Sequence, residues 1–178
     1  MKTIISMFTV LMLAFVSVSA QEEELGNPGV TPDNPLYFLD VAFDQFQTPE
    51  AVMNEKMAEA VAMARAQNQK GLAIALDRYG ASVDRRMANA NSDDLRADVA
   101  EQTSKHIAVL TSVREQVPDV AKDAIDLAIS ASTTERARAI TAITSQELRA
   151  STDVDTIADI ESRVPASSRD RVPTRGSY

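Results

Sequence analysis

His106 is the single histidine of the chain and the first side chain to consider for chemistry. An imidazole can bind a metal ion or act as a general base, and a base needs a nucleophile or an orienting carboxylate within hydrogen-bond reach. The neighbouring Thr103 and Ser104 would point to other sides of a helix. We therefore expect a structural histidine, partly buried and hydrogen-bonded to a neighbouring helix. The alternative is a metal-binding or partner-binding role.

Two groups of aspartates are the other candidates for a site. Asp119, Asp123 and Asp126 would share one face of a helix, and carboxylate oxygens suit hard cations such as Ca²⁺. The spacing lacks the glycine-containing loop of a calcium-binding hand. We expect a solvated acidic face, and the weaker alternative is that these three carboxylates bind a metal ion, as His106 is a separate weak candidate metal ligand. The same two interpretations apply to a second group, which consists of Asp153, Asp155 and Asp159.

The common catalytic motifs are absent from the sequence. It contains no Gly-x-Ser-x-Gly elbow, no His-Glu-x-x-His helix and no glycine-rich phosphate loop. One histidine cannot supply the pair of Glu-x-x-His motifs of a di-metal helical bundle. The lack of cysteine removes thiol catalysis, cysteine-based zinc sites and disulfides. The sequence therefore predicts a protein that is not an enzyme and that uses no cofactor.

The N-terminal segment has the pattern of a secretory signal peptide over residues 1–20. Lys2 precedes an apolar run from Ile4 to Val18, and small residues lead to a cleavage site between Ala20 and Gln21. The run is shorter than the roughly 20 apolar residues of a membrane-spanning helix. We expect a secreted or extracytoplasmic protein that is not inserted in the membrane after cleavage. The alternative is an uncleaved N-terminal membrane anchor.

Residues 21–34 are acidic and rich in proline and glycine, which predicts a linker. Asn34 and Pro35 suit the start of a short helix. The apolar residues that follow are spaced by three, four and three positions, and they predict a lid packed over the main bundle. An aromatic ligand pocket is the alternative, because aromatic residues cluster here. The apolar residues at this spacing are Leu36, Leu39, Phe43 and Phe46.

The remaining pattern is helical throughout, and we find no strand-like alternation. Thr48 and Pro49 begin a long apolar periodicity that continues to about Ala90, with Gly71 and Gly80 marking a bend or a close helix crossing. A short turn then leads to a second long helix that begins after Ser92. The sequence therefore predicts an all-α fold in which a long antiparallel helical hairpin extends into a four- to six-helix bundle-like domain.

Proline and cap residues divide the C-terminal half. Pro118 ends the second long helix and begins the next one. Thr133 or Thr134 is expected to cap a further helix, and Asp153 a last short one. These boundaries give a helical domain over residues 35–163, followed by a polar, disordered tail over residues 164–178.

The net charge of −8 limits the partners. Nucleic acids and anionic lipids are recognised through basic surfaces, so neither is expected to bind. The partner that we expect is another protein of the cell envelope. The sequence does not indicate an oligomeric state.

Three segments resemble the domain of unknown function 5667 family. They are Pro28-Gly29, the sequence PDNPLYFLD from Pro32 to Asp40, and the segment VAEQTSKHIAVLTSVREQVPDVAKDAIDLAISAS from Val99 to Ser132. The resemblance implies an extracytoplasmic helical domain of a secreted or membrane-anchored archaeal or bacterial protein. It implies no known activity, so it assigns no catalytic residue.

The function expected from the sequence is that of an exported, non-catalytic helical interaction or structural module of the cell envelope. The alternative is an extracytoplasmic metal-sensing or chaperone-like helical hairpin protein. Chaperones of that kind often carry Leu-Thr-x-x-Gln repeats, which this sequence lacks.

Overall fold

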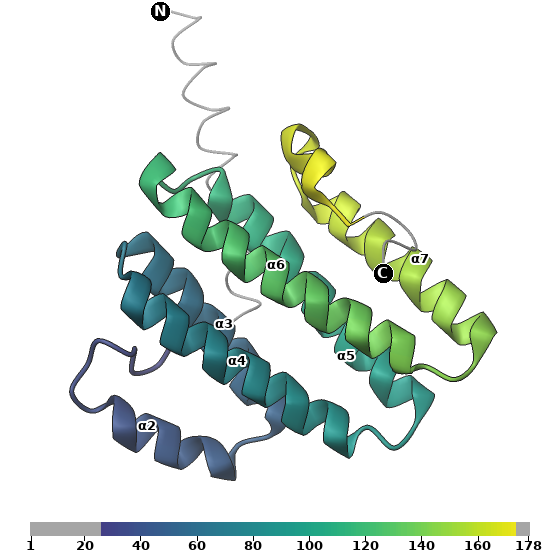
Figure 1. Cartoon of the computed structure of the whole chain (residues 1–178), viewed down its shortest axis with the longest axis horizontal. Helices are drawn as coiled ribbons and strands as arrows, with labels where there is room; N and C mark the ends of the chain where they lie inside the picture. The colour runs from purple at the N-terminus through teal and green to yellow at the C-terminus, as the bar shows by residue number, and fades with distance from the viewer. Residues whose placement is uncertain (1–25, 174–178) are drawn as a thin grey trace, which may run out of the picture.

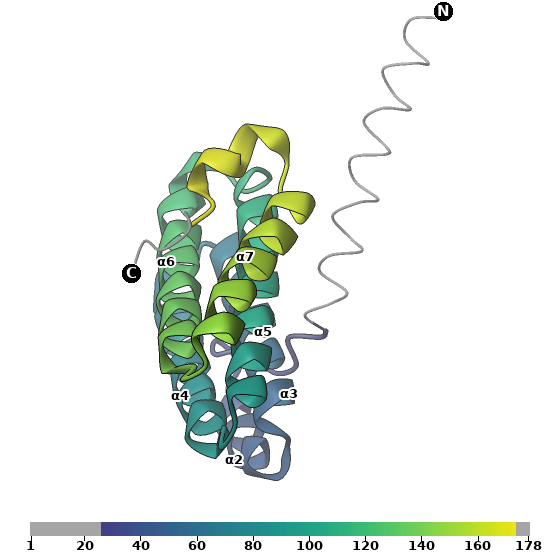
Figure 2. The ribbon, with the colours of Figure 1, turned by 90° about the vertical axis from the view of Figure 1, so that its right-hand side faces the viewer.

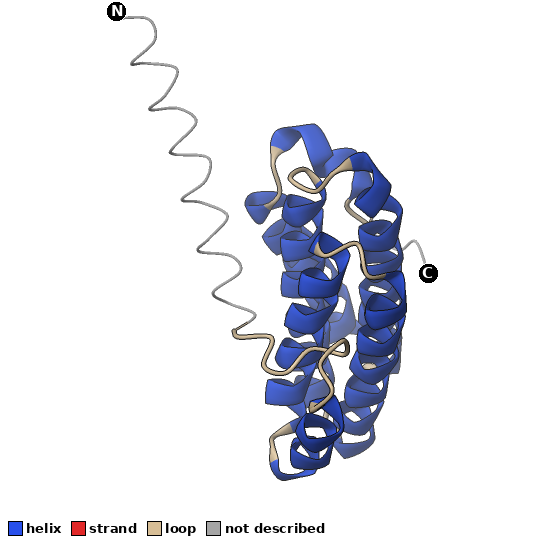
Figure 3. Cartoon of the chain, turned by 90° about the vertical axis from the view of Figure 1, so that its left-hand side faces the viewer, coloured by secondary structure: helices blue, strands red, loops and turns tan. Residues whose placement is uncertain are grey.

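The computed structural model describes residues 26–173. This part of the chain is built from helices and contains no strand (Figures 1 and 3), which confirms the predicted all-α, bundle-like fold. The predicted signal peptide, with its cleavage site at Ala20 and Gln21, lies outside the described residues. The elements are α2 (Tyr37–Phe43), η1 (Asp44–Phe46), α3 (Pro49–Arg65), α4 (Gln69–Asn89), α5 (Asp93–Arg114), α6 (Asp119–Ala142), α7 (Gln146–Arg163) and η2 (Ala166–Arg171), where η marks a 3₁₀ helix.

Two helical hairpins form the body of the bundle. Helix α3 packs against α4, and α5 packs against α6. The hairpins lie together with α4 beside α6 and α3 beside α5, and α7 covers α5 (Figure 2). Helix α2 lies on the opposite side of the bundle from α7 (Figure 1). The largest apolar side chains that are fully buried between the helices are Met53, Met57, Ile107, Leu110, Ile125, Ile140 and Ile160.

The expected single helix from Pro49 to about Ala90 is wrong, because the chain breaks between α3 and α4. Gln67 adopts a left-handed conformation with φ of 57°. The amide of Asn68 donates to the carbonyl of Met63, as in a Schellman motif, and the Asn68 side chain then caps α4 by accepting from the amide of Gly71. Glycine usually occupies the left-handed position of this motif, so a glutamine there gave no signal of the helix end.

Two helix boundaries in the C-terminal half also differ from the prediction. Helix α6 runs without interruption past Thr134, whose hydroxyl donates to the carbonyl of Ser130 inside the helix and so caps nothing. Helix α7 begins at Gln146, where the Ser145 side chain accepts from the amide of Leu148. Asp153 therefore lies inside α7 instead of at its start.

The segment after α7, expected to be a disordered tail, forms η2. Val164 and Val172 are buried on either side of it. Ser168 is also buried, and its hydroxyl donates to the Glu115 carboxylate at 2.7 Å. These contacts attach η2 to the end of α5, so the ordered domain extends past residue 163.

Charged side chains fix α7 to the bundle. Asp93, in the first turn of α5, accepts from the backbone amides of Thr144 and Ser145 at the start of α7, and these bonds hold its pKa well below the usual range. Arg136 of α6 is fully buried and donates to the Asp153 carboxylate at 2.8 Å and to the Thr156 hydroxyl. Within residues 26–173, no helix is long and apolar enough to cross a membrane.

The two glycines inside α4 give a matched test of this packing. A Cβ atom at Gly71 would collide with the Met63 sulfur and lie 2.9 Å from Asn68 Nδ2, whereas a Cβ atom at Gly80 would meet nothing within 4 Å. Gly80→Ala should raise the free energy of unfolding by up to about 1 kcal/mol through helix propensity. Gly71→Ala should lower it, because overpacking typically costs about 1–3 kcal/mol. Chemical denaturation of both variants measures this difference, and a stabilised Gly71→Ala variant would contradict the close α3–α4 packing.

Candidate functional site

His106 is fully buried in α5, as expected from its apolar neighbours. Its Nδ1 lies 3.2 Å from the Tyr79 hydroxyl and its Nε2 lies 3.0 Å from Asn54 Oδ1. Burial lowers the pKa of the imidazole to about 3, so the ring is neutral. Both ring nitrogens are used in contacts with α3 and α4. This arrangement is that of a structural histidine that ties three helices together.

The aspartates predicted as candidate metal ligands do not join His106 in a site. Asp119 pairs with Lys122 at 2.7 Å on α6. Asp126 accepts from the Arg114 guanidinium at 2.5 and 2.9 Å and links α6 to α5. In the described part of the chain, neither they nor Asp123 belong to a close group of three potential metal ligands. Their geometry fits the solvated acidic face that the sequence predicted.

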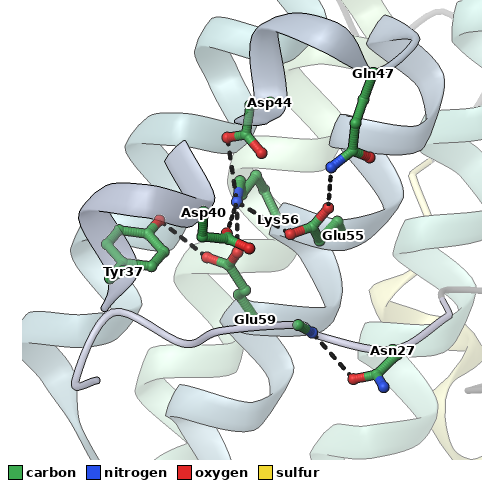
Figure 4. Close-up of polar contacts among 9 residues, drawn as sticks. Asn27, Tyr37, Asp40, Asp44, Gln47, Glu55, Lys56 and Glu59 are labelled. Carbon is green, nitrogen blue, oxygen red and sulfur yellow. Dashed lines mark hydrogen bonds and ion pairs between the residues drawn. The ribbon is translucent and has the colours of Figure 1, made fainter. Parts of the chain in front are cut away.

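The structure brings together a different set of charged residues, around Lys56 (Figure 4). The Lys56 side chain is fully buried in α3, on the side that faces α2 and η1. Four carboxylates surround its ammonium group, and we call this arrangement the Lys56 cluster. Its Nζ atom lies 2.6 Å from Glu59 Oε1, 2.9 Å from Asp40 Oδ2, 3.2 Å from Asp44 Oδ2 and 3.4 Å from Glu55 Oε1.

The helical repeat accounts for how the cluster forms. Tyr37, Asp40 and Asp44 are spaced by three and four positions, so they face the same side of α2 and its 3₁₀ extension. Lys56 and Glu59 are spaced by three positions on α3. The Tyr37 hydroxyl donates to Glu59 Oε2 at 3.0 Å, and Nζ of Lys56 lies 5.4 Å from the centre of its ring. Polar side chains therefore form the contact between α2 and the bundle.

Burial dominates the electrostatics of the carboxylates in the cluster. It raises the pKa of Glu59 to about 7 despite the hydrogen bonds from Lys56 and Tyr37, and it also raises the pKa of Asp44 and of Glu55. Burial alone would lower the pKa of the Lys56 ammonium, but the hydrogen bonds to Glu59 and Asp40 outweigh it and raise the pKa. Lys56 thus stays charged, while negative charge is in excess around it.

The Lys56 cluster contains the one close group of potential metal ligands found among residues 26–173. Oxygen atoms of Asp40, Glu55 and Glu59 lie within 4.8 Å of one another. Each of these three carboxylates also pairs with Nζ of Lys56. A metal ion would have to displace the ammonium group from the position it occupies. The residues therefore fit a salt-bridge cluster, in which lysine is the cation, better than a metal centre.

The apolar side of α2 faces solvent, which contradicts the predicted lid. We call Leu36, Leu39, Phe43 and Phe46 the apolar stripe; their exposed fractions are 54%, 44%, 62% and 78%. The rings of Phe43 and Phe46 lie 6.4 Å apart, and Phe38 is exposed as well. These side chains lie on the surface and do not surround a pocket. The polar side of α2 faces the bundle because it pairs with the buried Lys56. Leaving that buried charge without partners would cost more free energy than leaving the apolar residues of α2 exposed.

Sequence reasoning missed Lys56, although a signal was present. Lys56 lies among Met53, Met57 and Ala60, which hold core positions of α3, and it is the first basic residue after Lys2. A lone lysine within a core stripe needs a buried acidic partner. Comparison with known proteins adds no assignment, because no family model, curated protein or solved structure matches this chain.

The raised pKa of Glu59 predicts a pH dependence of stability. An unfolded glutamate loses its proton near pH 4.5, whereas Glu59 in the folded protein holds it up to about pH 7. The folded state therefore binds more protons in this window, and the free energy of unfolding falls as the pH rises through it. Glu59→Gln should remove the part of this fall that comes from Glu59, which amounts to at most about 3 kcal/mol in the free energy of unfolding.

Chemical denaturation at several pH values in this window measures the effect. The buried His106 gives the opposite slope below its unfolded pKa of 6.5, but it does so in both proteins and cancels in the comparison. Glu101→Gln is the matched control, because Glu101 is largely exposed and pairs only across one helix turn with Lys105. Equal slopes for the wild type and Glu59→Gln would refute the proton uptake by Glu59.

Proposed function

We propose that this chain is an exported, non-catalytic helical interaction module of the cell envelope that binds another protein through the apolar stripe of α2 and η1. The observation that carries the proposal is the exposure of Leu39, Phe43 and Phe46 on a helix whose polar side is held by the Lys56 cluster. Contiguous exposed apolar side chains on a soluble surface are characteristic of binding sites. The stripe is held in place by the bundle and is thus available to a partner.

The absence of a catalytic arrangement in the described residues supports a non-catalytic role. His106 is buried and neutral and contacts Tyr79 and Asn54, so it has no access to a substrate. Glu59, the carboxylate with a pKa near neutrality, is also fully buried, beneath Lys56 and Tyr37. A general acid or base must reach the reacting group.

Export and family membership belong to the same proposal. Export rests on the apolar run from Ile4 to Val18 and the small residues before Gln21. Membership of the domain of unknown function 5667 family rests on the sequence motifs. Within one of them, from Pro32 to Asp40, the residues Tyr37 and Asp40 bind Glu59 and Lys56. One of the three motifs that carry the resemblance therefore attaches α2 to the bundle.

The alternative from the sequence, a metal-sensing or chaperone-like protein, divides in two. Metal sensing finds little support, because Lys56 takes the place of a cation among Asp40, Glu55 and Glu59. A chaperone-like role is favoured by the same apolar stripe, since exposed phenylalanines also bind unfolded chains. The two roles differ in whether one partner or many contact the stripe.

Site-specific photo-crosslinking in the cells that make the protein tests this proposal. A crosslinking amino acid at Phe46 should give one or a few adducts of defined mass, and Phe43→Ser in the same chain should reduce them at least tenfold. Leu127 of α6, which is 65% exposed, is the matched control position and should give none of these adducts. A continuous smear of adducts from Phe46 would indicate a chaperone-like role. Identical adducts from both positions, or none from either, would refute the docking face.

A further inference from the structure

We propose that α2 and η1 form an arm that is docked on the bundle at mildly acidic pH and is released as the pH rises above neutrality. The arm consists of residues 37–46. The ionisable side chains of the Lys56 cluster hold it in place (Figure 4). The movement of the arm does not depend on the proposed function, but its consequence for a partner rests on that function, because the arm carries the apolar stripe.

The arm is attached by polar contacts and not by apolar packing. No residue of α2 is buried. The Tyr37 hydroxyl donates to the Glu59 carboxylate at 3.0 Å. The carboxylates of Asp40 and Asp44 pair with Lys56 at 2.9 and 3.2 Å. These contacts end within a single turn of α3, so the free energy of docking depends on the charges of one small group of side chains.

The connection between the arm and α3 has the geometry of a hinge. Gln47 and Thr48 lie outside the helices and are extended, with φ/ψ angles of −91°/160° and −68°/146°. Thr48 caps α3 by accepting from the amide of Ala51, so α3 keeps its first turn when the arm leaves. The Gln47 side chain donates to Glu55, which belongs to the same cluster. Rotation about the backbone of Gln47 therefore frees the arm without unwinding α3.

The charges around Glu59 give the direction of the movement. The titratable and charged groups of the cluster and its surroundings are Tyr37 and Asp40 of α2, Asp44 of η1, Glu55 and Lys56 of α3, and Arg78 of α4, which acts on Tyr37 and Asp44. When Glu59 is ionised, four carboxylates share the ammonium group of Lys56. When Glu59 is protonated, three share it. Loss of the proton therefore increases the repulsion between the arm and α3.

The pKa values in the cluster agree with this direction. Burial raises the pKa of Glu59 to about 7, and it also raises the pKa of Asp44 and of Glu55. Release exposes Glu59 to water and returns its pKa toward 4.5. The docked arm thus binds more protons, so docking weakens as the pH rises through this range, by up to roughly 300-fold from Glu59 alone. Burial lowers the pKa of Lys56, but its hydrogen bonds outweigh burial, so it stays charged throughout.

Release of the arm also removes the apolar stripe. Helix α2 has seven residues, and isolated helices shorter than about 12 residues are marginal in water. Leu39 and Phe43 share one face only while α2 is helical. A released arm therefore presents no continuous apolar face. Under the proposed function, a partner binds the docked arm at mildly acidic pH and dissociates as the pH rises above neutrality.

Förster resonance energy transfer in the purified full chain tests the movement. The chain has no cysteine, so two introduced cysteines can carry a pair of fluorophores that are insensitive to pH. The arm pair is Phe38→Cys/Leu127→Cys, at positions that are 66% and 65% exposed. The bundle pair is Val154→Cys/Leu127→Cys, which joins α7 to α6. Between pH 5.5 and 8.5, the ratio of released to docked molecules should rise at least tenfold for the arm pair, while the bundle pair stays constant.

Glu59→Gln in the arm pair should reduce this rise at least threefold, because its side chain is neutral at every pH. Glu101→Gln, at an exposed pair with Lys105, is the matched control and should leave the rise unchanged. A constant signal from the arm pair would overturn the inference. So would a parallel change in both pairs, which would show unfolding of the whole bundle, or an equal rise with and without Glu59→Gln. An arm that stays docked at every pH leaves the stripe exposed, so photo-crosslinking from Phe46 decides the proposed function separately.

Discussion

The buried ammonium group of Lys56 is the interaction on which the arrangement of α2 depends. A charge without partners in the interior is far more costly than an exposed apolar side chain. Lys56 is fully buried on the side of α3 that faces α2 and η1. Its Nζ atom lies 2.9 Å from the Asp40 carboxylate and 3.2 Å from the Asp44 carboxylate, and both of these residues come from the segment that precedes the bundle. Asp40 and Asp44 therefore determine which side of α2 faces inward, and the apolar residues take the side that remains.

This constraint links stability to the proposed role. The apolar stripe would contribute to folding if it faced the bundle, so its exposure is a cost that the ion pairs and the Tyr37–Glu59 hydrogen bond offset. The apolar area that the bundle leaves exposed can be buried by a partner instead. Burying one phenylalanine side chain contributes roughly 1.5–3 kcal/mol to binding. The two hairpins provide the rigid support, and the contacts of His106 with Tyr79 and Asn54 join α5 to the α3–α4 hairpin inside the bundle.

The helical fold and the burial of His106 could be predicted from the sequence, because apolar spacing and local neighbours determine both. The break at Gln67 could not be predicted, since nothing in the sequence distinguishes a glutamine in the left-handed conformation from one inside a helix. Only the tertiary packing of α3 on α4 selects the left-handed conformation. The side on which α2 packs was predicted wrongly for a related reason. Periodicity identifies Leu39 and Phe43 as one face, but it does not say whether that face or the face of Asp40 meets the bundle; the position of Lys56 decides it.

Hydrogen exchange of the Lys56→Met variant, followed by mass spectrometry, tests the central role of this lysine most directly. Peptides that cover α2 should exchange much faster than in the wild type, while peptides of α5 keep their protection, because the ion pairs hold α2 and the apolar core holds α5. Lys105→Met is the matched control, since Lys105 forms only a surface pair with Glu101, and it should leave α2 unchanged. Unchanged protection of α2 in Lys56→Met would contradict the role of Lys56 in holding α2, and so would a loss of protection in α2 and α5 together.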